Sequence, residues 1–154
     1  NTGHGALRQM ADLAERESAS VIAVQDVPRE QTGSYGIVAT RDFSGRHGEI
    51  SAIVEKPKPE VAPSNLAVVG RYVLSGSIFD LLAKTRPGAG GEIQLTDGIA
   101  ALMEKERVLA YRFEGRRFDC GSRIGLVEAT MQFALDHEDL AEPTREFMRA
   151  ALAR

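Results

Sequence analysis

The segment that decides the fold runs from Ile53 to Tyr72 and reads IVEKPKPEVAPSNLAVVGRY. Its first apolar run ends in Glu55 and Lys56, directly before a proline, and its second apolar run ends in Gly-Arg-Tyr. Because the residue before a proline is pushed from helical toward extended conformations, we expect Lys56 to be extended. An acid that accepts from hydroxyls, beside a cation that meets a phosphate, predicts a site for a phosphorylated sugar.

The position of Lys56 also predicts where the first strand ends. Strand alternation places Lys56 on the same face as Val54, where a lysine within a strand would be buried at high cost. We therefore expect the strand to end here, with Glu55 and Lys56 free to turn into a cleft. The alternative is a solvated strand end with a surface ion pair of little energetic value. The short motif alone leaves both interpretations open.

The composition is that of one ordinary globular domain. The chain has 154 residues, of which 43% are hydrophobic and 27% are charged, with a net charge of −3. This charge gives no reason to expect a nucleic-acid partner, and no apolar run approaches the roughly 20 residues of a membrane span. The single cysteine excludes an internal disulfide and favours a reducing compartment. We therefore expect a cytoplasmic protein without nucleic-acid or membrane partners.

Strand-like and helix-like segments alternate along the chain. Strands are expected at residues 20–25, 35–40, 49–56, 66–74 and 108–113. Helices are expected at residues 5–17, 77–84 and 94–106, from Ser122 onward, and after Pro143. The run SVIAVQ at 20–25 is wholly apolar, which predicts a strand covered on both faces. Several connections between strands are too short for a purely parallel sheet, so we expect an α/β domain with a mixed sheet.

The last two helices are each expected to bury one apolar face. For the helix that begins at Ser122, the spacing predicts an inward face made of Ile124, Val127, Met131, Ala134 and Leu135. For the last helix, Pro143 suits the opening position and the apolar stripe consists of Phe147, Ala151 and Leu152.

Asp119, within RRFDCGSRIG, is a second candidate for chemistry. It follows a short expected strand and precedes a glycine and Ser122, so its carboxylate would project toward a helix start. This position suits Mg²⁺, which proteins hold with one or two carboxylates while phosphate oxygens complete the shell. The alternative is that Asp119 only caps the helix. Cys120 is interpreted as a small core residue because no histidine partner is evident.

Weaker signals lie at four further positions. Gly36 opens a strand, where a glycine marks a bend or lets a backbone amide reach a ligand. Asn65 is suited to closing a turn before its strand. Arg71 and Tyr72 alternate, so only one of them faces the core. The stretch GGEIQLTD, with Glu92 and Thr96, is by itself a structural helix start.

Taken together and in order, five stretches resemble a known family. They are SVIAVQDVP, SYGIV, VEKPKPEVAPSNLAVVGRYVL, RPGAGGEIQLTD and YRFEGRRFDCGSRIG. They resemble the C-terminal portion of the bacterial UTP–glucose-1-phosphate uridylyltransferases, within the sugar-phosphate nucleotidyltransferases, over nearly the whole chain. The resemblance implies a Rossmann-like nucleotidyltransferase fold with a mixed central sheet. Residues 1–154 would be the C-terminal, sugar-phosphate-binding part of one domain, with 136–154 as a helical tail. The N-terminal nucleotide-binding half, with its glycine-rich loop, would be absent.

The implied reaction joins UTP and glucose 1-phosphate into UDP-glucose and pyrophosphate, with Mg²⁺. By resemblance, Lys56 and Asp119 would be the catalytic residues: Lys56 would contact the sugar phosphate, and Asp119 would be one of two metal-binding aspartates. Glu55 would bind sugar hydroxyls and Gly36 would offer its amide to the sugar. The remaining substrate-binding positions implied by the resemblance are Val68, Tyr72, Asn65 and Glu92.

Two departures from the family pattern are Gly98 and Arg123, where alanine and lysine are expected. The resemblance also implies a homo-oligomer, a dimer or a tetramer.

Other functions remain open at this point. A second interpretation is a self-sufficient sugar-phosphate-binding or interaction module without catalysis. A piece of a larger domain should show an unpaired sheet edge and an open apolar face where the nucleotide half belongs, whereas a self-sufficient module should cover both. A nucleotidyltransferase that uses dTTP or CTP is a further alternative, because the base-binding residues would lie in the other half. We expect the isolated 1–154 chain to be inactive.

Overall fold

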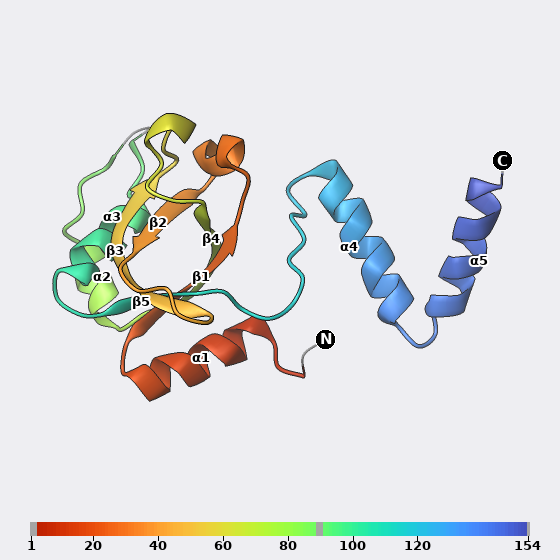
Figure 1. The fold of residues 1–154 in the computed structure, drawn as a ribbon, viewed down its shortest axis with the longest axis horizontal. Coiled ribbons are helices and arrows are strands. Elements are labelled where there is room, and N and C mark those ends of the chain that lie inside the picture. Colours follow the sequence, from red (N-terminus) through yellow and green to blue (C-terminus); the bar gives the residue numbers. More distant parts are fainter. Residues whose placement is uncertain (1–2, 89–90, 154) are drawn as a thin grey trace. The chain divides into compact units, whose positions relative to one another are not determined.

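The computed structural model describes residues 3–88 and 91–153. These residues fall into two compact units, a first unit up to Gly115 and a second unit from Arg116 onward. Among the described residues, the first unit holds a five-stranded sheet and three helices, and the second unit holds two helices (Figure 1). No helix formed by the described residues has the length and apolarity needed to cross a membrane.

The elements of the first unit agree with the sequence pattern. Its strands are β1 (Ser20–Asp26), β2 (Gly36–Thr40), β3 (His47–Glu55), β4 (Leu66–Val73) and β5 (Val108–Tyr111). Its helices are α1 (Ala6–Glu17), α2 (Ser77–Leu82) and α3 (Leu95–Met103), with 3-10 turns at Arg29–Ser34 and Pro59–Val61. Each strand and helix that we expected in this unit is present, because its apolar period is a local property of the chain.

The sheet is mixed, as expected. Its strand order is β1-β4-β2-β3-β5, and β5 pairs back onto β1. The β1–β5 pair is parallel and the other pairs are antiparallel. The unpaired edge that would mark a piece of a larger domain is not found among the described residues, because each of the five strands has two neighbours in a closed ring. Closure removes the exposed edges that an open sheet leaves.

β1 is buried on both faces, which confirms the expectation from its apolar run. Ile22 and Val24 belong to the larger core, which α2 and α3 cover. Val21 and Ala23 point the other way, into a second cluster with Met10 and Leu13 of α1. Figure 1 shows α1 on one side of the strands and α2 and α3 on another. Because side chains alternate along a strand, β1 contributes residues to both hydrophobic clusters.

The second unit consists of α4 (Arg123–Asp136) and α5 (Ala141–Leu152), which contact each other. Ser122 is the N-cap of α4, since its Oγ accepts from the amide of Gly125 at 3.0 Å. The inward face that we expected for α4 was wrong. Its buried residues are Gly125 and Ala129, whereas Ile124 is 66% exposed. Two helices alone bury only a narrow seam, and here small residues form it.

The last helix begins two residues earlier than expected, at Ala141, so that Pro143 is its third residue. A proline is tolerated there because the first-turn amides have no partner within the helix. Its apolar stripe lies open, with Phe147 69% and Leu152 85% exposed. The expectation that this helix buries its apolar stripe was therefore wrong, because no residue of α5 is buried. The open apolar face expected where the nucleotide half belongs stays a prediction. The helical tail of residues 136–154 contains α5, and its place in a larger domain stays a prediction.

Candidate functional site

The register of the first unit brings Gly36, Glu55 and Val68 together. Gly36, the first residue of β2, pairs with Glu55, the last residue of β3, and β4 lies on the other side of β2. A Cβ on Gly36 would lie 3.2 Å from Glu55 Oε2 and 3.7 Å from a methyl group of Val68. Three residues that the family resemblance implied to be substrate-binding thus converge from three strands.

Thr96 joins this group from α3, although it was not predicted as a site residue. Its hydroxyl donates to Glu55 Oε2 at 2.6 Å. The same hydroxyl would lie 3.8 Å from a Cβ on Gly36. The signal in the sequence was the hydroxyl within QLTD, but only the packing of α3 against β3 reveals its partner.

Tyr72 also belongs to this neighbourhood. Tyr72 packs against the larger core while Arg71 is exposed, as strand alternation requires. Burial raises the pKa of the Tyr72 hydroxyl above its usual 10.0, and the negative charge of Glu55 raises it further. A half-buried phenol close to a carboxylate resists losing its proton. Tyr72 therefore stays a neutral hydrogen-bond donor at physiological pH.

Lys56 is the residue directly after Glu55, and its backbone conformation differs from the one we expected. The strand ends at Glu55 as predicted, but Lys56 has φ of 43°, in the left-handed region, so the extended conformation was wrong. Its amide donates to the carbonyl of Tyr35 at 3.0 Å, and this bond closes the β2–β3 ladder and outweighs the local preference. The side chain is 64% exposed, with Nζ 3.9 Å from Glu55 Oε1.

Asn65 and Glu92 have other surroundings. Asn65 Oδ1 accepts from Arg29 at 3.4 Å, and the Asn65 carbonyl accepts from the Val27 amide at 3.0 Å. These bonds hold the turn before β4, which is the structural role that its position suggested. Glu92 is exposed, and its carbonyl accepts from the Gly88 amide at 2.9 Å. The recorded contacts of these two residues do not include Glu55 or Lys56.

Asp119 lies in the second unit, in a turn rather than after a strand. β5 ends at Tyr111, and residues 112–121 form no strand because they pair with none of the five strands. Asp119 Oδ1 accepts from the Gly121 amide at 3.1 Å, and Oδ2 lies 3.7 Å from Arg117. Its side chain is half exposed. Capping belongs to Ser122, so the capping alternative for Asp119 was wrong.

Two neighbours fix the Asp119 turn from the start of α4. The Asp119 carbonyl accepts from the Ser122 hydroxyl at 3.0 Å and from the Ser122 amide at 3.1 Å. A Cβ on Gly125 would collide with that carbonyl. Glycine is therefore required there for the helix to approach the turn. Cys120 is exposed, so its interpretation as a core residue was wrong.

The acidic side chains set a limit on any metal site. Among the described residues, no cluster of three or more His, Cys, Asp or Glu side chains is arranged to hold an ion. Asp119 nevertheless fits as a single ligand, because it is half exposed and one carboxylate suffices where phosphate oxygens complete the Mg²⁺ shell.

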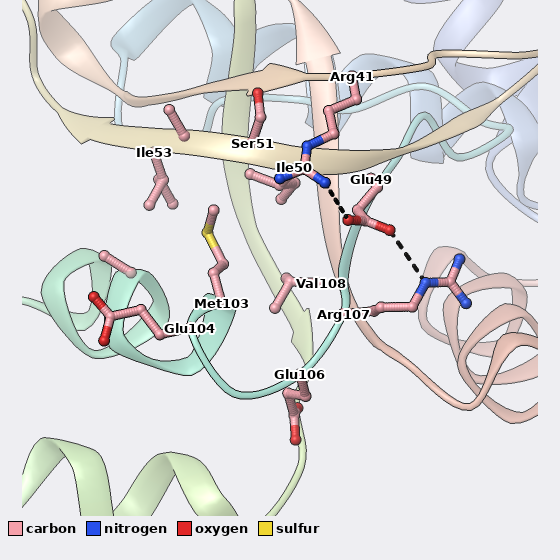
Figure 2. A pocket seen from close by; sticks show the side chains of 12 residues that line it. Arg41, Glu49, Ile50, Ser51, Ile53, Met103, Glu104, Glu106, Arg107 and Val108 are labelled. Atoms are coloured by element: carbon pink, nitrogen blue, oxygen red, sulfur yellow. Dashed lines mark hydrogen bonds and ion pairs between the residues drawn. The ribbon is translucent and has the colours of Figure 1, made fainter.

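A hollow of about 350 Å³ in the first unit contains none of the predicted site residues. Apolar side chains that include Ile53, Met103 and Val108 line it. Figure 2 shows Glu49 between two arginines at its rim. Glu49 Oε1 lies 3.4 Å from Arg41, and Glu49 Oε2 lies 3.2 Å from Arg107. Because the lining carries Arg41 and Arg107 against Glu49, Glu104 and Glu106, acidic side chains outnumber basic ones and the hollow does not favour a phosphate.

The mixed α/β fold and the residues gathered around Glu55 fit the nucleotidyltransferase class. Residues 2–135 match the family model described as nucleotidyl transferase, and the chain belongs to that family.

Individual relatives are more specific. The chain is 48% identical to a UTP–glucose-1-phosphate uridylyltransferase of Pseudomonas aeruginosa over 128 residues, 83% of this chain and 46% of that protein. Among solved structures, it is similar to a UTP-bound UGPase from Acinetobacter baumannii, with 39% identity and a TM-score of 0.83, over 99% of this chain and 51% of that one. A UDP-glucose pyrophosphorylase in complex with UDP-glucose matches with 38% identity and a TM-score of 0.82, over 89% and 52% of the two chains. The chain spans about half the length of the relatives it matches.

Proposed function

We propose that this chain is the sugar-phosphate-binding part of a UTP–glucose-1-phosphate uridylyltransferase. The observation that supports this most is the arrangement at the end of β3. There Glu55 is held by Thr96 at 2.6 Å beside the exposed Lys56 ammonium at 3.9 Å. A fixed carboxylate suits sugar hydroxyls and an exposed ammonium suits a phosphate. The names of the relatives supply the particular sugar and nucleotide.

The reaction places modest demands on the protein. A phosphate oxygen of glucose 1-phosphate attacks the α-phosphorus of UTP in line, a new P–O bond forms, and the bond to pyrophosphate breaks. Such transfers depend on positioning and charge stabilisation rather than on a nucleophile from the protein. None of the residues gathered here has to form a covalent intermediate.

Each proposed residue has a defined part in this step. Lys56 neutralises the attacking phosphate, which would otherwise repel the triphosphate. Glu55, with Gly36, Val68 and Tyr72 around it, binds and orients the sugar. Asp119 offers a carboxylate oxygen to Mg²⁺, which when bound neutralises charge on the phosphates of both substrates. Asn65 and Glu92 are proposed only as supports of the adjoining loops.

The test is UDP-glucose formation by the complete natural polypeptide that carries these residues, with UTP, glucose 1-phosphate and Mg²⁺. Lys56→Ala is expected to lower kcat/KM about 100-fold, since it removes a charge that acts on the transferred group. Asp119→Ala is expected to raise the Mg²⁺ concentration required. Lys58→Ala, an exposed lysine two residues away, is the matched control and should retain activity. Full activity of Lys56→Ala would contradict the assignment.

A second candidate is a sugar-phosphate-binding module without catalysis. The closed ring of five strands favours it, because the first unit leaves no edge for further strands to pair with. Binding of glucose 1-phosphate without turnover would support this alternative. Turnover with dTTP or CTP but not UTP would assign a different nucleotide. We also propose that the protein is cytoplasmic and that it forms a homo-oligomer. Light scattering of the purified protein tests the oligomeric state.

A further inference from the structure

The two oxygens of the Glu55 carboxylate have different surroundings. Oε2 accepts from the Thr96 hydroxyl at 2.6 Å, and it is also the oxygen that a Cβ on Gly36 would approach to 3.2 Å. Oε1 lies 3.9 Å from Lys56 Nζ. One oxygen is therefore engaged with the protein, while the other lies beside the cation that would meet a phosphate.

The hydroxyl that holds Glu55 is itself fixed in place. Thr96 is the second residue of α3, and the following turns of that helix are buried at Ile99 (1% exposed) and Leu102 (0% exposed). Such packing leaves the helix little freedom to move. A hydroxyl that donates to a carboxylate at this distance forms a strong, charge-assisted bond. The orientation of Glu55 is thus set from α3 and not by its own strand.

Resting on the proposed function, we propose that Thr96 is a positioning residue for the sugar. Its hydroxyl holds Oε2 of Glu55 so that Oε1 points to a sugar hydroxyl, and the missing side chain at Gly36 leaves the space that this arrangement needs. Gly36 contributes by having no side chain, which leaves space for the Glu55 carboxylate, in addition to any contact made by its backbone amide.

A threonine that only stabilised the fold would behave differently. Its loss would lower stability and reduce all ligand binding in proportion. A positioning role instead predicts that one sugar hydroxyl stops contributing to binding while the phosphate is still recognised. The distinction lies in which ligand group loses its contact, and it is measurable by calorimetric titration.

The experiment uses the complete natural polypeptide and measures binding of glucose 1-phosphate, its monodeoxy analogues and inorganic phosphate. Thr96→Val removes the hydroxyl at nearly constant shape, and Thr96→Ser retains it. Thr85→Val is the matched control, because the Thr85 hydroxyl donates only to the Leu81 carbonyl of α2. Thr96→Val should weaken glucose 1-phosphate binding about tenfold, and Thr96→Ser should restore it. Inorganic phosphate should bind all four proteins alike.

The analogues supply the decisive comparison. In the wild type, one monodeoxy analogue should bind about tenfold more weakly than glucose 1-phosphate, and in Thr96→Val that same analogue should bind as well as the parent sugar. Equal sensitivity of wild type and Thr96→Val to every deoxy position would overturn the proposal. So would a loss of phosphate binding that parallels the loss of sugar binding.

Gly36→Ala tests the same arrangement by another route, since it keeps the backbone amide and every polar group. Its Cβ would press on Glu55 Oε2, so it should reproduce the loss of discrimination seen in Thr96→Val. Gly33→Ala is its control, because a Cβ there meets only the Pro57 carbonyl at 3.7 Å. If Gly36→Ala discriminated among the deoxy sugars as the wild type does, the proposal that Gly36 leaves space for the Glu55 carboxylate would be refuted.

The outcomes also separate this inference from the proposed function. A wild type that binds glucose 1-phosphate but forms no UDP-glucose would refute the enzyme assignment and leave the Thr96 comparison valid. A wild type that forms UDP-glucose while Thr96→Val keeps the wild-type discrimination would refute only the inference. A wild type that does not bind glucose 1-phosphate would overturn both.

Discussion

Tyr72 is the residue whose titration reports on the surroundings of Glu55. In the folded protein the pKa of the Tyr72 hydroxyl lies above 10.0. Burial is the larger cause and the negative charge of Glu55 is the smaller one. Folding therefore favours the protonated phenol. The stability linked to this group is fully present below pH 10 and is lost as the pH rises through the higher folded pKa.

Tyr72→Phe is expected to remove this dependence. The difference in unfolding free energy between wild type and Tyr72→Phe should be constant up to about pH 10. Above about pH 10 the wild type should lose stability relative to Tyr72→Phe. Urea titrations from pH 8 to 11.5 measure this difference. Glu55→Gln should move the phenol titration, followed by absorbance near 295 nm, part of the way back. Parallel pH profiles for wild type and Tyr72→Phe would show that the environment is wrongly described.

At the scale of elements, the contact between α2 and α3 explains one departure from the family pattern. A Cβ on Gly98 would lie 2.5 Å from a methyl group of Leu82 and 3.4 Å from Ile78. Glycine lets the two helices approach closely and so seats α3, which carries Thr96, against β3. Arg123, the other departure, is the first residue of α4, and nothing in the structure explains it.

Gly98→Ala should lower the unfolding free energy by about 1 kcal/mol, because overpacking outweighs the gain in helix propensity. In a Leu82→Ala background, the same substitution should instead raise it by about 1 kcal/mol, since only the propensity gain remains. Denaturant unfolding of the four proteins of this double-mutant cycle measures the coupling. Equal effects of Gly98→Ala in both backgrounds would mean that Leu82 does not limit the packing.

The helices show where a local pattern stops being sufficient. The sequence correctly predicted that a helix starts after Ser122, because a capping hydroxyl is a local signal. It wrongly assigned the buried face, since Ile124 and Val127 are exposed and Ala129 is buried. Which face a helix buries depends on what packs against it, and the spacing of apolar residues does not contain that information.

At the scale of the whole molecule, we expect the chain limited to residues 1–154 to form no UDP-glucose. The resemblance places the glycine-rich triphosphate loop in the other half of these enzymes, and this chain spans about half of its relatives. Weak binding of glucose 1-phosphate should persist, because Glu55, Lys56 and Thr96 all lie in the first unit.

The measurement is an assay with UTP, glucose 1-phosphate and Mg²⁺ on protein whose intact mass is 16.7 kDa. The complete natural polypeptide is assayed beside it as the positive control. Turnover by the 16.7 kDa species would show that these residues suffice for catalysis.

The sequence by itself determined the order and type of the elements, the end of β3 at Glu55 and the family resemblance. These follow from apolar period, capping groups and short motifs, which are properties of neighbouring residues. The family resemblance also placed Gly36, Glu55 and Val68 in one expected site, and the structure brings these three residues together.

Only the tertiary structure decided how these pieces meet. It closed β5 onto β1, turned Lys56 into the left-handed region, and brought Thr96 to Glu55 across 41 residues of sequence. It also moved Asp119 from an expected strand end into a turn fixed by Ser122 and Gly125. The reason is that pairing and close approach depend on the register of strands and the seating of helices, which distant parts of the chain set together.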